Sequence, residues 1–161
     1  MTEDPALATE RLLHDLFPVC RSITGPGLRA SLRRIGEDIP LEITEVPTGT
    51  RVLDWDVPRE WVIRSATLED LGGHTIVDFA EHSLHVLNYS VGVERVVALA
   101  ELQAHLHSLP EQPDRIPYRT SYYREDWGFC LAHRVREGLR DEAYRVRIDA
   151  ELVDGALSYG E

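Results

Sequence analysis

The chain has 161 residues, of which 43% are hydrophobic, and its formal net charge at pH 7 is −11, from 28 acidic and 17 basic residues. This length and composition predict one domain, or a compact core that carries an inserted lobe. The negative charge argues against nucleic acid and anionic membrane surfaces as partners, because both would repel it. No apolar run approaches the ~20 residues that a transmembrane helix needs.

The two cysteines, Cys20 and Cys130, lie far apart in the sequence, and no secretory signal precedes them. Disulfides form mainly in oxidising compartments, which secreted proteins reach through such a signal. We therefore expect a cytoplasmic protein whose thiols are reduced.

The first fifty residues indicate two helices and a strand. A helix is predicted over residues 6–17 and a second over 28–35, with Thr24 or Gly25 near the N-cap of the second. The N–H groups at that helix start can hold an anion, or Thr24 only caps the helix. Residues 41–46 alternate between apolar and polar, which is typical of a half-buried strand. The first helix has an apolar side formed by Leu7, Leu12, Leu13, Leu16 and Phe17.

From Arg51 onward the pattern changes to short strands, which predicts a small β-rich lobe. A hairpin turn is expected at residues 70–73, and a helix over 98–109 with Leu99, Leu102 and Leu106 as its buried side. The expected strands of this lobe are residues 61–68, 75–79, 85–90 and 93–97.

The last third of the chain predicts a helix over residues 129–139 and strands over 144–153 and 156–160. The fold class is therefore α+β, with helices at the start and strands in the middle and at the end. Because the final strand has only begun when the sequence stops, and a strand needs a partner, we expect the chain to be the front part of a longer protein.

An aromatic and polar stretch, residues 116–133, stands out from the rest of the sequence. It holds three tyrosines, a tryptophan, two arginines, Cys130 and His133. One interpretation is a loop that faces a cleft and grips a polar ligand, since such rings offer stiff surface with hydrogen-bonding tips. The other is an aromatic corner that fills a small core.

Histidine pairs at His82/His85 and His105/His107 are the candidates for metal binding, because imidazole is a common zinc ligand. His105 and His107 are two residues apart on a predicted helix and would point to different sides. His82 and His85 have no third ligand at an obvious spacing. We therefore favour ordinary surface histidines over a metal site.

A cysteine nucleophile with a histidine base is a further candidate chemistry. Cys130 and His133 would share one face if their segment were helical. A buried, unreactive cysteine beside a histidine is the commoner arrangement, and Cys20 offers no stronger case.

Four runs together resemble a bacterial and archaeal family of aminopeptidase-like proteins that was long classed as a domain of unknown function. They are residues 16–25, 53–61, 109–123 and 127–130. The resemblance implies a zinc exopeptidase-like domain with an inserted lid lobe and a C-terminal winged helix in the complete protein. Mapped onto this chain, it implies three segments: residues 1–49 and 143–161 belong to the peptidase domain, and residues 50–142 form the lid.

The resemblance also implies where the chemistry lies. The family's zinc ligands follow the segment that this chain matches, so no catalytic or metal residue is expected here, and zinc is expected only in the full-length family member. The expected substrate-facing residues are Arg21, Ser22, Thr24, Arg119, Ser121, Tyr122 and Tyr123. Arg21 or Arg119 suits a carboxylate, because guanidinium binds it through two parallel hydrogen bonds.

The resulting functional hypothesis is an N-terminal segment of a zinc-dependent aminopeptidase-like hydrolase that supplies lid and pocket rim and is inactive alone. Its partner would be a small-molecule or peptide substrate, with no nucleic acid and no membrane, and homo-oligomer formation is left open. The alternative is a non-enzymatic module that binds a small ligand or a protein partner. A cysteine-dependent enzyme is a third and weaker alternative.

Overall fold

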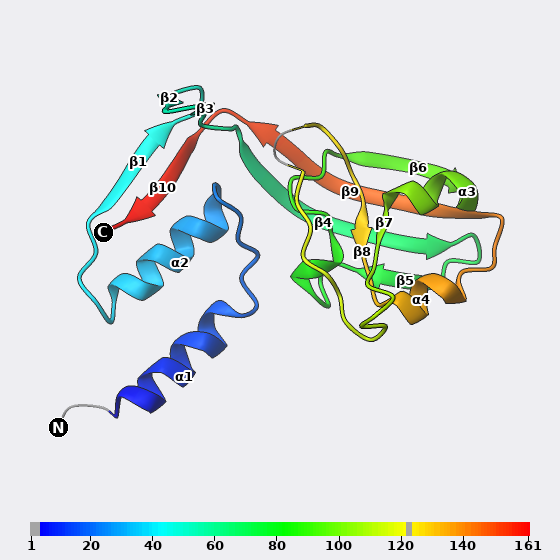
Figure 1. The fold of residues 1–161 in the computed structure, drawn as a ribbon, viewed down its shortest axis with the longest axis horizontal. Helices are drawn as coiled ribbons and strands as arrows, with labels where there is room; N and C mark the ends of the chain where they lie inside the picture. Colours follow the sequence, from blue (N-terminus) through cyan, green and yellow to red (C-terminus); the bar gives the residue numbers. More distant parts are fainter. Residues whose placement is uncertain (1–3, 122–123) are drawn as a thin grey trace. The chain divides into compact units, whose positions relative to one another are not determined.

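A computed structural model describes residues 4–121 and 124–161 of the chain. The chain divides into two compact units, each of which is described by itself. Unit 1 runs from the N-terminus to Glu60 and resumes with Val153–Glu161. Unit 2 is Trp61–Leu152, so the chain leaves unit 1 once and returns to it once. Figure 1 shows the elements of both units along the chain.

Unit 1 consists of two helices, a two-stranded antiparallel sheet and a short hairpin. The carboxylate of Asp4 caps the first helix by accepting the Ala6 N–H at 2.9 Å. Strands β1 and β10 pair from Ile43 opposite Gly160 to Pro47 opposite Ala156. The elements are α1 (Pro5–Leu16), α2 (Pro26–Gly36), β1 (Ile43–Pro47), β2 (Arg51–Val52), β3 (Trp55–Asp56) and β10 (Ala156–Gly160).

The β2–β3 hairpin presents a leucine at its tip. Leu53 has φ 53° and its side chain is 92% exposed. The left-handed backbone region is unfavourable for residues with a bulky side chain, and turns usually place glycine or asparagine there. Leu53 therefore occupies a position that its own conformational preference does not explain.

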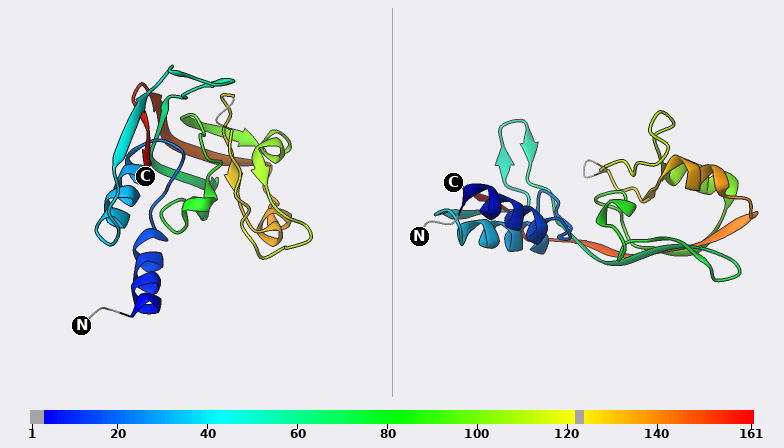
Figure 2. Two further views of the ribbon diagram at one scale, coloured as in Figure 1. Left: turned by 60° about the vertical axis from the view of Figure 1, so that its left-hand side comes forward. Right: turned by 90° about the horizontal axis from the view of Figure 1, so that it is seen from below.

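Unit 2 is built on a four-stranded sheet in the order β5-β4-β9-β6. Alternate residues of β9 are buried, with Tyr144, Val146 and Ile148 each at most 3% exposed. The described parts of the chain between β6 and β9 lie on one face of this sheet (Figure 2, right). The sheet strands are β4 (Glu60–Asp70), β5 (Thr75–Asp78), β6 (Val93–Ala98) and β9 (Ala143–Val153).

Short elements cover that face of the sheet. Among them, β7 (Leu106–His107) and β8 (Phe129–Cys130) form a two-residue parallel pair. The others are the 3₁₀ turns η1 (Ser83–His85) and η2 (Gln103–His105) and the helices α3 (Leu99–Leu102) and α4 (His133–Gly138). In the described ranges, no helix combines the length and the apolar character that crossing a bilayer requires.

The α+β fold class is confirmed, as are both N-terminal helices, Gly25 as the N-cap of α2, the hairpin of β4 with β5, and strands β6, β9 and β10. The predicted helix over residues 98–109 is wrong. Helix α3 ends at Leu102, and Leu106 instead pairs with Phe129 as a strand. Of the three leucines predicted to be buried, Leu102 and Leu106 are buried and Leu99 is half-buried, so the spacing predicted burial better than it predicted a helix.

Two further element predictions need correction. Residues 129–139 do not form one helix, because Phe129 and Cys130 belong to β8 and α4 begins only at His133. Residues 85–90 do not form a strand. They carry isolated bridges at Val86, Asn88 and Ser90 to residues that lie far along the chain. In each case pairing with a distant segment determines the backbone, and local sequence does not record that pairing.

The apolar side predicted for α1 is largely exposed. No side chain of α1 is fully buried, and Leu7, Leu13 and Phe17 are 58%, 66% and 71% exposed. Ion pairs join α1 to α2 and to the turn after α2. Arg34 of α2 pairs with Asp15 at 2.7 Å, and Asp38 of the turn pairs with Arg11 at 3.1 Å.

Candidate functional site

The residues expected to face a substrate fall into two groups, one in each unit. Arg21, Ser22 and Thr24 belong to unit 1, whereas Arg119 and Ser121 belong to unit 2. Tyr122 and Tyr123 lie outside the described residues. The two groups are therefore considered separately.

In unit 1, the loop before α2 uses most of its polar groups internally. Ser22 Oγ donates to the Thr24 carbonyl at 2.7 Å, and Thr24 is only 2% exposed. The Arg21 guanidinium donates to the Leu16 carbonyl at the end of α1. The side chains of Ser22 and Arg21 thus hold the loop through backbone carbonyls, and Arg21 already uses one of its N–H groups for this contact.

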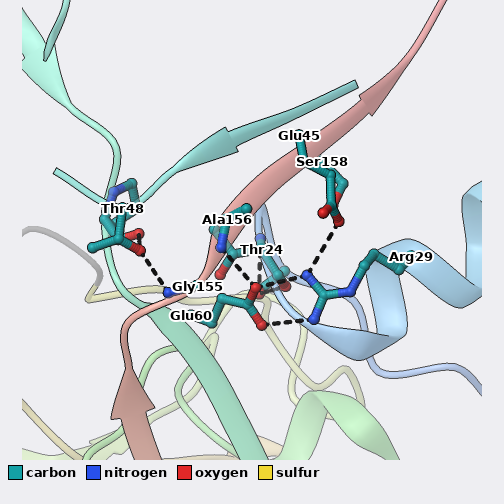
Figure 3. Close-up of polar contacts among 10 residues, drawn as sticks. Thr24, Arg29, Glu45, Thr48, Glu60, Gly155, Ala156 and Ser158 are labelled. Atoms are coloured by element: carbon teal, nitrogen blue, oxygen red, sulfur yellow. Dashed lines mark hydrogen bonds and ion pairs between the residues drawn. The ribbon is translucent and has the colours of Figure 1, made fainter. Parts of the chain in front are cut away.

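The strongest polar cluster of unit 1 was not predicted. The Glu60 carboxylate accepts two hydrogen bonds from Arg29, at 2.6 and 2.8 Å, and a third from the Ala156 backbone N–H at 2.8 Å (Figure 3). Hydrogen bonding and charge from Arg29 lower the pKa of Glu60 below its usual value, although burial opposes this. Glu60 is 6% exposed, so a negative charge is held inside unit 1.

Close packing surrounds this carboxylate. A Cβ on Gly155 would collide with the Glu60 side chain, so glycine is needed there. Thr48 holds the same turn, because its hydroxyl accepts the Gly155 N–H at 3.1 Å (Figure 3). Glu60 thereby connects α2, the start of β4 and the start of β10. The partners of Glu60 lie far away in the sequence, at Arg29 and Ala156, so the residues around Glu60 gave no indication of this cluster.

In unit 2, Arg119 differs from most arginines of the chain. Its carbonyl accepts the Asn88 N–H at 2.9 Å, but among the described residues its guanidinium has no recorded hydrogen bond or ion pair. The side chain lies near His107 and Cys130, since its positive charge acts on both of them. Ser121 is buried, and both its N–H and its hydroxyl donate to the Asn88 carbonyl. Ser121 is therefore a structural residue, and Arg119 keeps its charge available.

The groups beside Arg119 are uncharged at neutral pH. Burial lowers the pKa of His107 below its ordinary value, and the charges of Arg119 and Arg136 lower it further. Burial raises the pKa of Cys130 to about 12, and burial also raises that of Cys20. Because thiolate is the nucleophilic form, neither cysteine is activated as a nucleophile.

The rings of His82 and His85 lie edge to face with centroids 6.1 Å apart, whereas the Nδ1 atoms of both rings bond to backbone groups. The ring Nδ1 of His85 donates to the Cys130 carbonyl at 2.9 Å, and that of His105 donates to the Trp127 carbonyl at 2.8 Å. His82 Nδ1 accepts the Leu84 N–H at 3.1 Å. Within residues 4–121 and 124–161, no group of three or more histidine, cysteine or acidic residues could hold a metal. Zinc therefore does not fit the side chains of the described chain.

Trp127 acts as an aromatic corner in the predicted stretch. Its ring stacks on His105 with centroids 3.8 Å apart, and the Arg95 guanidinium lies 5.6 Å from its centroid. A Cβ on Gly128 would lie 2.6 Å from the His105 carbonyl oxygen, so close approach of the backbone requires this glycine. Each interpretation of residues 116–133 therefore describes a different residue: Trp127 fills the core, as the aromatic-corner interpretation predicts, and Arg119 is exposed, as the ligand-binding interpretation requires.

Residues 60–151 match the family described as a domain of unknown function, DUF2172. The chain belongs to this family. The DUF2172 range nearly coincides with unit 2, which is Trp61–Leu152.

Longer relatives of this DUF2172 chain have been named. Over 150 residues it is 50% identical to a Clostridium acetobutylicum protein named "Putative polysaccharide biosynthesis protein with aminopeptidase-like domain", covering 93% of this chain and 35% of that protein. A crystal structure at 2.37 Å resolution of a "putative peptidase" from Clostridium acetobutylicum is similar to it, with a TM-score of 0.90 and 48% identity. That match covers 96% of this chain and 37% of the other, so the DUF2172 chain spans little more than a third of the length of these relatives.

Proposed function

We propose that this chain is the part of a zinc-dependent aminopeptidase-like hydrolase that supplies the lid and the rim of the substrate pocket. In this proposal unit 2 is the lid, unit 1 is part of the peptidase domain, and the sequence-based limits at residues 50 and 142 remain predictions. The observation that carries it is the match of 93% of the chain to about a third of a relative named for its aminopeptidase-like domain. The catalytic metal is then held by residues outside this chain.

A measurement of bound zinc tests whether the catalytic metal is held by residues outside this chain. The purified 161-residue chain is incubated with zinc, passed through a desalting column and analysed for bound metal. We expect far less than one zinc per chain and no hydrolysis of aminoacyl p-nitroanilides. We expect the full-length Clostridium acetobutylicum relative to retain zinc and to lose any peptidase activity when zinc is chelated. One tightly bound zinc in the 161-residue chain, or a zinc-free and active full-length relative, would contradict the proposal.

Arg119 is the residue of this chain that we propose as the anchor for a substrate carboxylate. Its side chain is exposed and has no hydrogen bond or ion pair among the described residues. The neighbouring His107 and Cys130 are uncharged at neutral pH, so neither forms an ion pair with it or attracts the substrate carboxylate. A carboxylate gains two parallel hydrogen bonds from such a guanidinium. Arg21, by comparison, already donates to the Leu16 carbonyl.

The dipeptide alanyl-alanine serves as a probe of this role in NMR titrations of the chain. We expect it to perturb the amide signals of Arg119 and its neighbours, and Arg119→Gln to remove that perturbation. Arg33→Gln is the matched control, because Arg33 is also an exposed arginine without a recorded partner in the described part of the chain. Equal loss in both variants would indicate nonspecific charge attraction and would refute the assignment.

A non-enzymatic binding module is the second candidate, and one observation favours it. The family model corresponds closely to unit 2 alone, and unit 2 contains Arg119 with its charge unpaired among the described residues. Saturable binding of the dipeptide by the chain, together with a full-length relative that lacks hydrolase activity, would select this candidate. We also propose a cytoplasmic location, because Cys20 and Cys130 are unpaired as in reduced proteins.

A further inference from the structure

One buried segment of unit 2 holds both ends of the loop that carries Arg119. We call it the brace and define it as residues 87–91. Leu87, Asn88, Tyr89 and Ser90 are each at most 6% exposed. The brace belongs to no regular strand, and its backbone hydrogen bonds go mainly to segments more than thirty residues away.

The first limb of the loop is held by both backbone groups of Asn88. The Asn88 N–H donates to the Arg119 carbonyl at 2.9 Å, and the Asn88 carbonyl accepts the Ser121 N–H at 3.0 Å. This pair of bonds fixes the backbone on either side of Thr120. The direction in which the Arg119 side chain leaves the loop therefore depends on Asn88.

The second limb is held by the residues that flank Asn88. Val91 N–H donates to the Asp126 carbonyl at 2.9 Å, and Leu87 N–H donates to the Gly128 carbonyl at 3.0 Å. The Ser90 hydroxyl, which is fully buried, accepts the Gly128 N–H at 3.2 Å. One five-residue segment thus bonds to the loop before residue 122 and after residue 125.

Tyr89 turns the backbone in the middle of the brace. Its φ is 71°, in the left-handed region that a bulky residue rarely adopts. Trp61 supports this conformation in two ways: its ring stacks on Tyr89 with centroids 6.0 Å apart, and its indole N–H donates to the Ser90 carbonyl at 2.9 Å. Such strained residues persist only where their surroundings over-determine them, and they are often found at binding sites.

We propose that Tyr89 and Trp61 are positioning residues that hold the Arg119 loop in the shape that binds a carboxylate-containing substrate. This inference rests on the proposed role of Arg119. The left-handed turn at Tyr89 lets Asn88 face one limb while Leu87 and Val91 face the other. The brace therefore pre-orders Arg119 and the described limbs on either side of residues 122 and 123 before any ligand arrives, which lowers the entropy cost of binding.

Two substitutions at Tyr89 separate backbone conformation from packing. Asparagine tolerates the left-handed region, whereas valine does not, because it is β-branched. Tyr89 is buried, so packing alone would favour valine. We expect Tyr89→Asn to keep more of the brace than Tyr89→Val, measured as hydrogen exchange protection of the Asn88, Ser121 and Val91 amides. Equal protection in both variants, or better protection in Tyr89→Val, would overturn the proposal.

Trp61→Phe keeps an aromatic ring but removes the donor to Ser90. We expect faster exchange at the same amides and alanyl-alanine binding weakened about tenfold, the effect of losing one good hydrogen bond. The Val146 amide in β9 should keep its protection, which shows that unit 2 remains folded. Unchanged binding after the loop amides lose protection would overturn the positioning role.

Arg119→Gln distinguishes failure of this inference from failure of the proposed function. It should abolish dipeptide binding while leaving the brace amides protected. If the unmodified chain binds no dipeptide, the proposed role of Arg119 fails and the positioning role fails with it. The exchange data would then still decide whether the left-handed turn at Tyr89 orders the loop.

Discussion

Arg29 and Glu60 face each other through two nearly parallel hydrogen bonds, at 2.6 and 2.8 Å, although they lie 31 residues apart in the sequence. Arg29 comes from the first turn of α2, and Glu60 is the first residue of β4. The two-bond geometry restrains both side chains at once, and the Ala156 N–H adds a third contact from β10. Three segments of unit 1 are therefore joined at one carboxylate.

Replacing Glu60 with glutamine should destabilise unit 1 markedly. The Arg29 side chain is 27% exposed and would keep only the more distant Glu45, at 3.7 Å, as a negatively charged partner, which we expect to cost about 2–3 kcal/mol. Hydrogen exchange of the β1 and β10 amides at increasing urea concentration would measure this change in unit 1. Arg11→Gln is the control, since it breaks an exposed pair with Asp38 and should cost under about 1 kcal/mol. Equal losses of unfolding free energy in the two variants would mean that the buried Arg29–Glu60 pair stabilises the protein no more than an exposed pair does.

Gly155→Ala should disturb the same carboxylate from the other side. The new Cβ would collide with Glu60, which has to move, and we expect a loss of about 1–3 kcal/mol. Gly36→Ala makes the same chemical change at the end of α2, where nothing lies within 4 Å of the new Cβ. That control should be stabilised by about 0.5–1 kcal/mol, because alanine favours helix. The two variants should therefore shift the denaturation midpoint in opposite directions.

Acid should weaken the two units in different pH ranges. Folding lowers the pKa of His107 below 6.5 and that of Glu60 below 4.5. For both groups the unfolded chain binds the proton more readily, so stability is complete above these values and falls as pH decreases through them. Unit 2 should begin to lose stability below about pH 6.5, and unit 1 only below about pH 4.5.

Hydrogen exchange measured at several pH values would follow the two units separately. His107→Gln should remove the upper part of the pH dependence in unit 2, and Glu60→Gln the lower part in unit 1. A pH dependence that neither substitution alters would show that other groups control acid unfolding.

The two cysteines should differ in reactivity. Cys130 is fully buried, and burial raises the pKa of its thiol to about 12 from an ordinary value of 9.0. Its thiolate fraction is then about a thousandfold below that of a free cysteine. We expect Ellman's reagent at pH 8 to label a Cys20→Ser variant only after denaturant is added. Rapid labelling of that variant while it is folded would revive the cysteine-enzyme hypothesis.

Leu53 should be replaceable with a gain in stability. Its left-handed backbone is unfavourable for leucine, and asparagine should relieve about 0.5–1 kcal/mol of that strain. Leu71→Asn is the control, because Leu71 is also an exposed turn residue but has no positive φ. Thermal denaturation should show a higher midpoint for Leu53→Asn alone. A lower midpoint would mean that the leucine makes a stabilising contact.

The sequence predicts β9 well, because one face of this strand is buried and the burial repeats every two residues along it. It fails at residues 98–109, where Leu99, Leu102 and Leu106 have helical spacing but the backbone leaves the helix after Leu102. The pairing of Leu106 with Phe129 decides that outcome, and no local pattern records a partner 23 positions later. Local periodicity thus predicts burial more reliably than backbone conformation.

The same limit applies to the candidate site. The sequence allows Arg119 to be proposed from its residue type and its surroundings, and within residues 4–121 and 124–161 its guanidinium has no partner, which keeps that prediction open to test. Glu60 and the brace could not be found in this way. Glu60 depends on contacts 31 and 96 residues away, and Tyr89 depends on a backbone angle that its residue type disfavours. Both are products of the folded chain.

The contact between Glu60 and Ala156 also has a consequence for the history of the gene. The chain leaves unit 1 directly after Glu60 and re-enters at Val153, so the points of departure and return are neighbours within unit 1. A stretch of coding sequence acquired at a single position leaves this arrangement. A short linker in place of residues 61–152 would close the gap, so proteins can be sought that have the unit 1 architecture without residues 61–152.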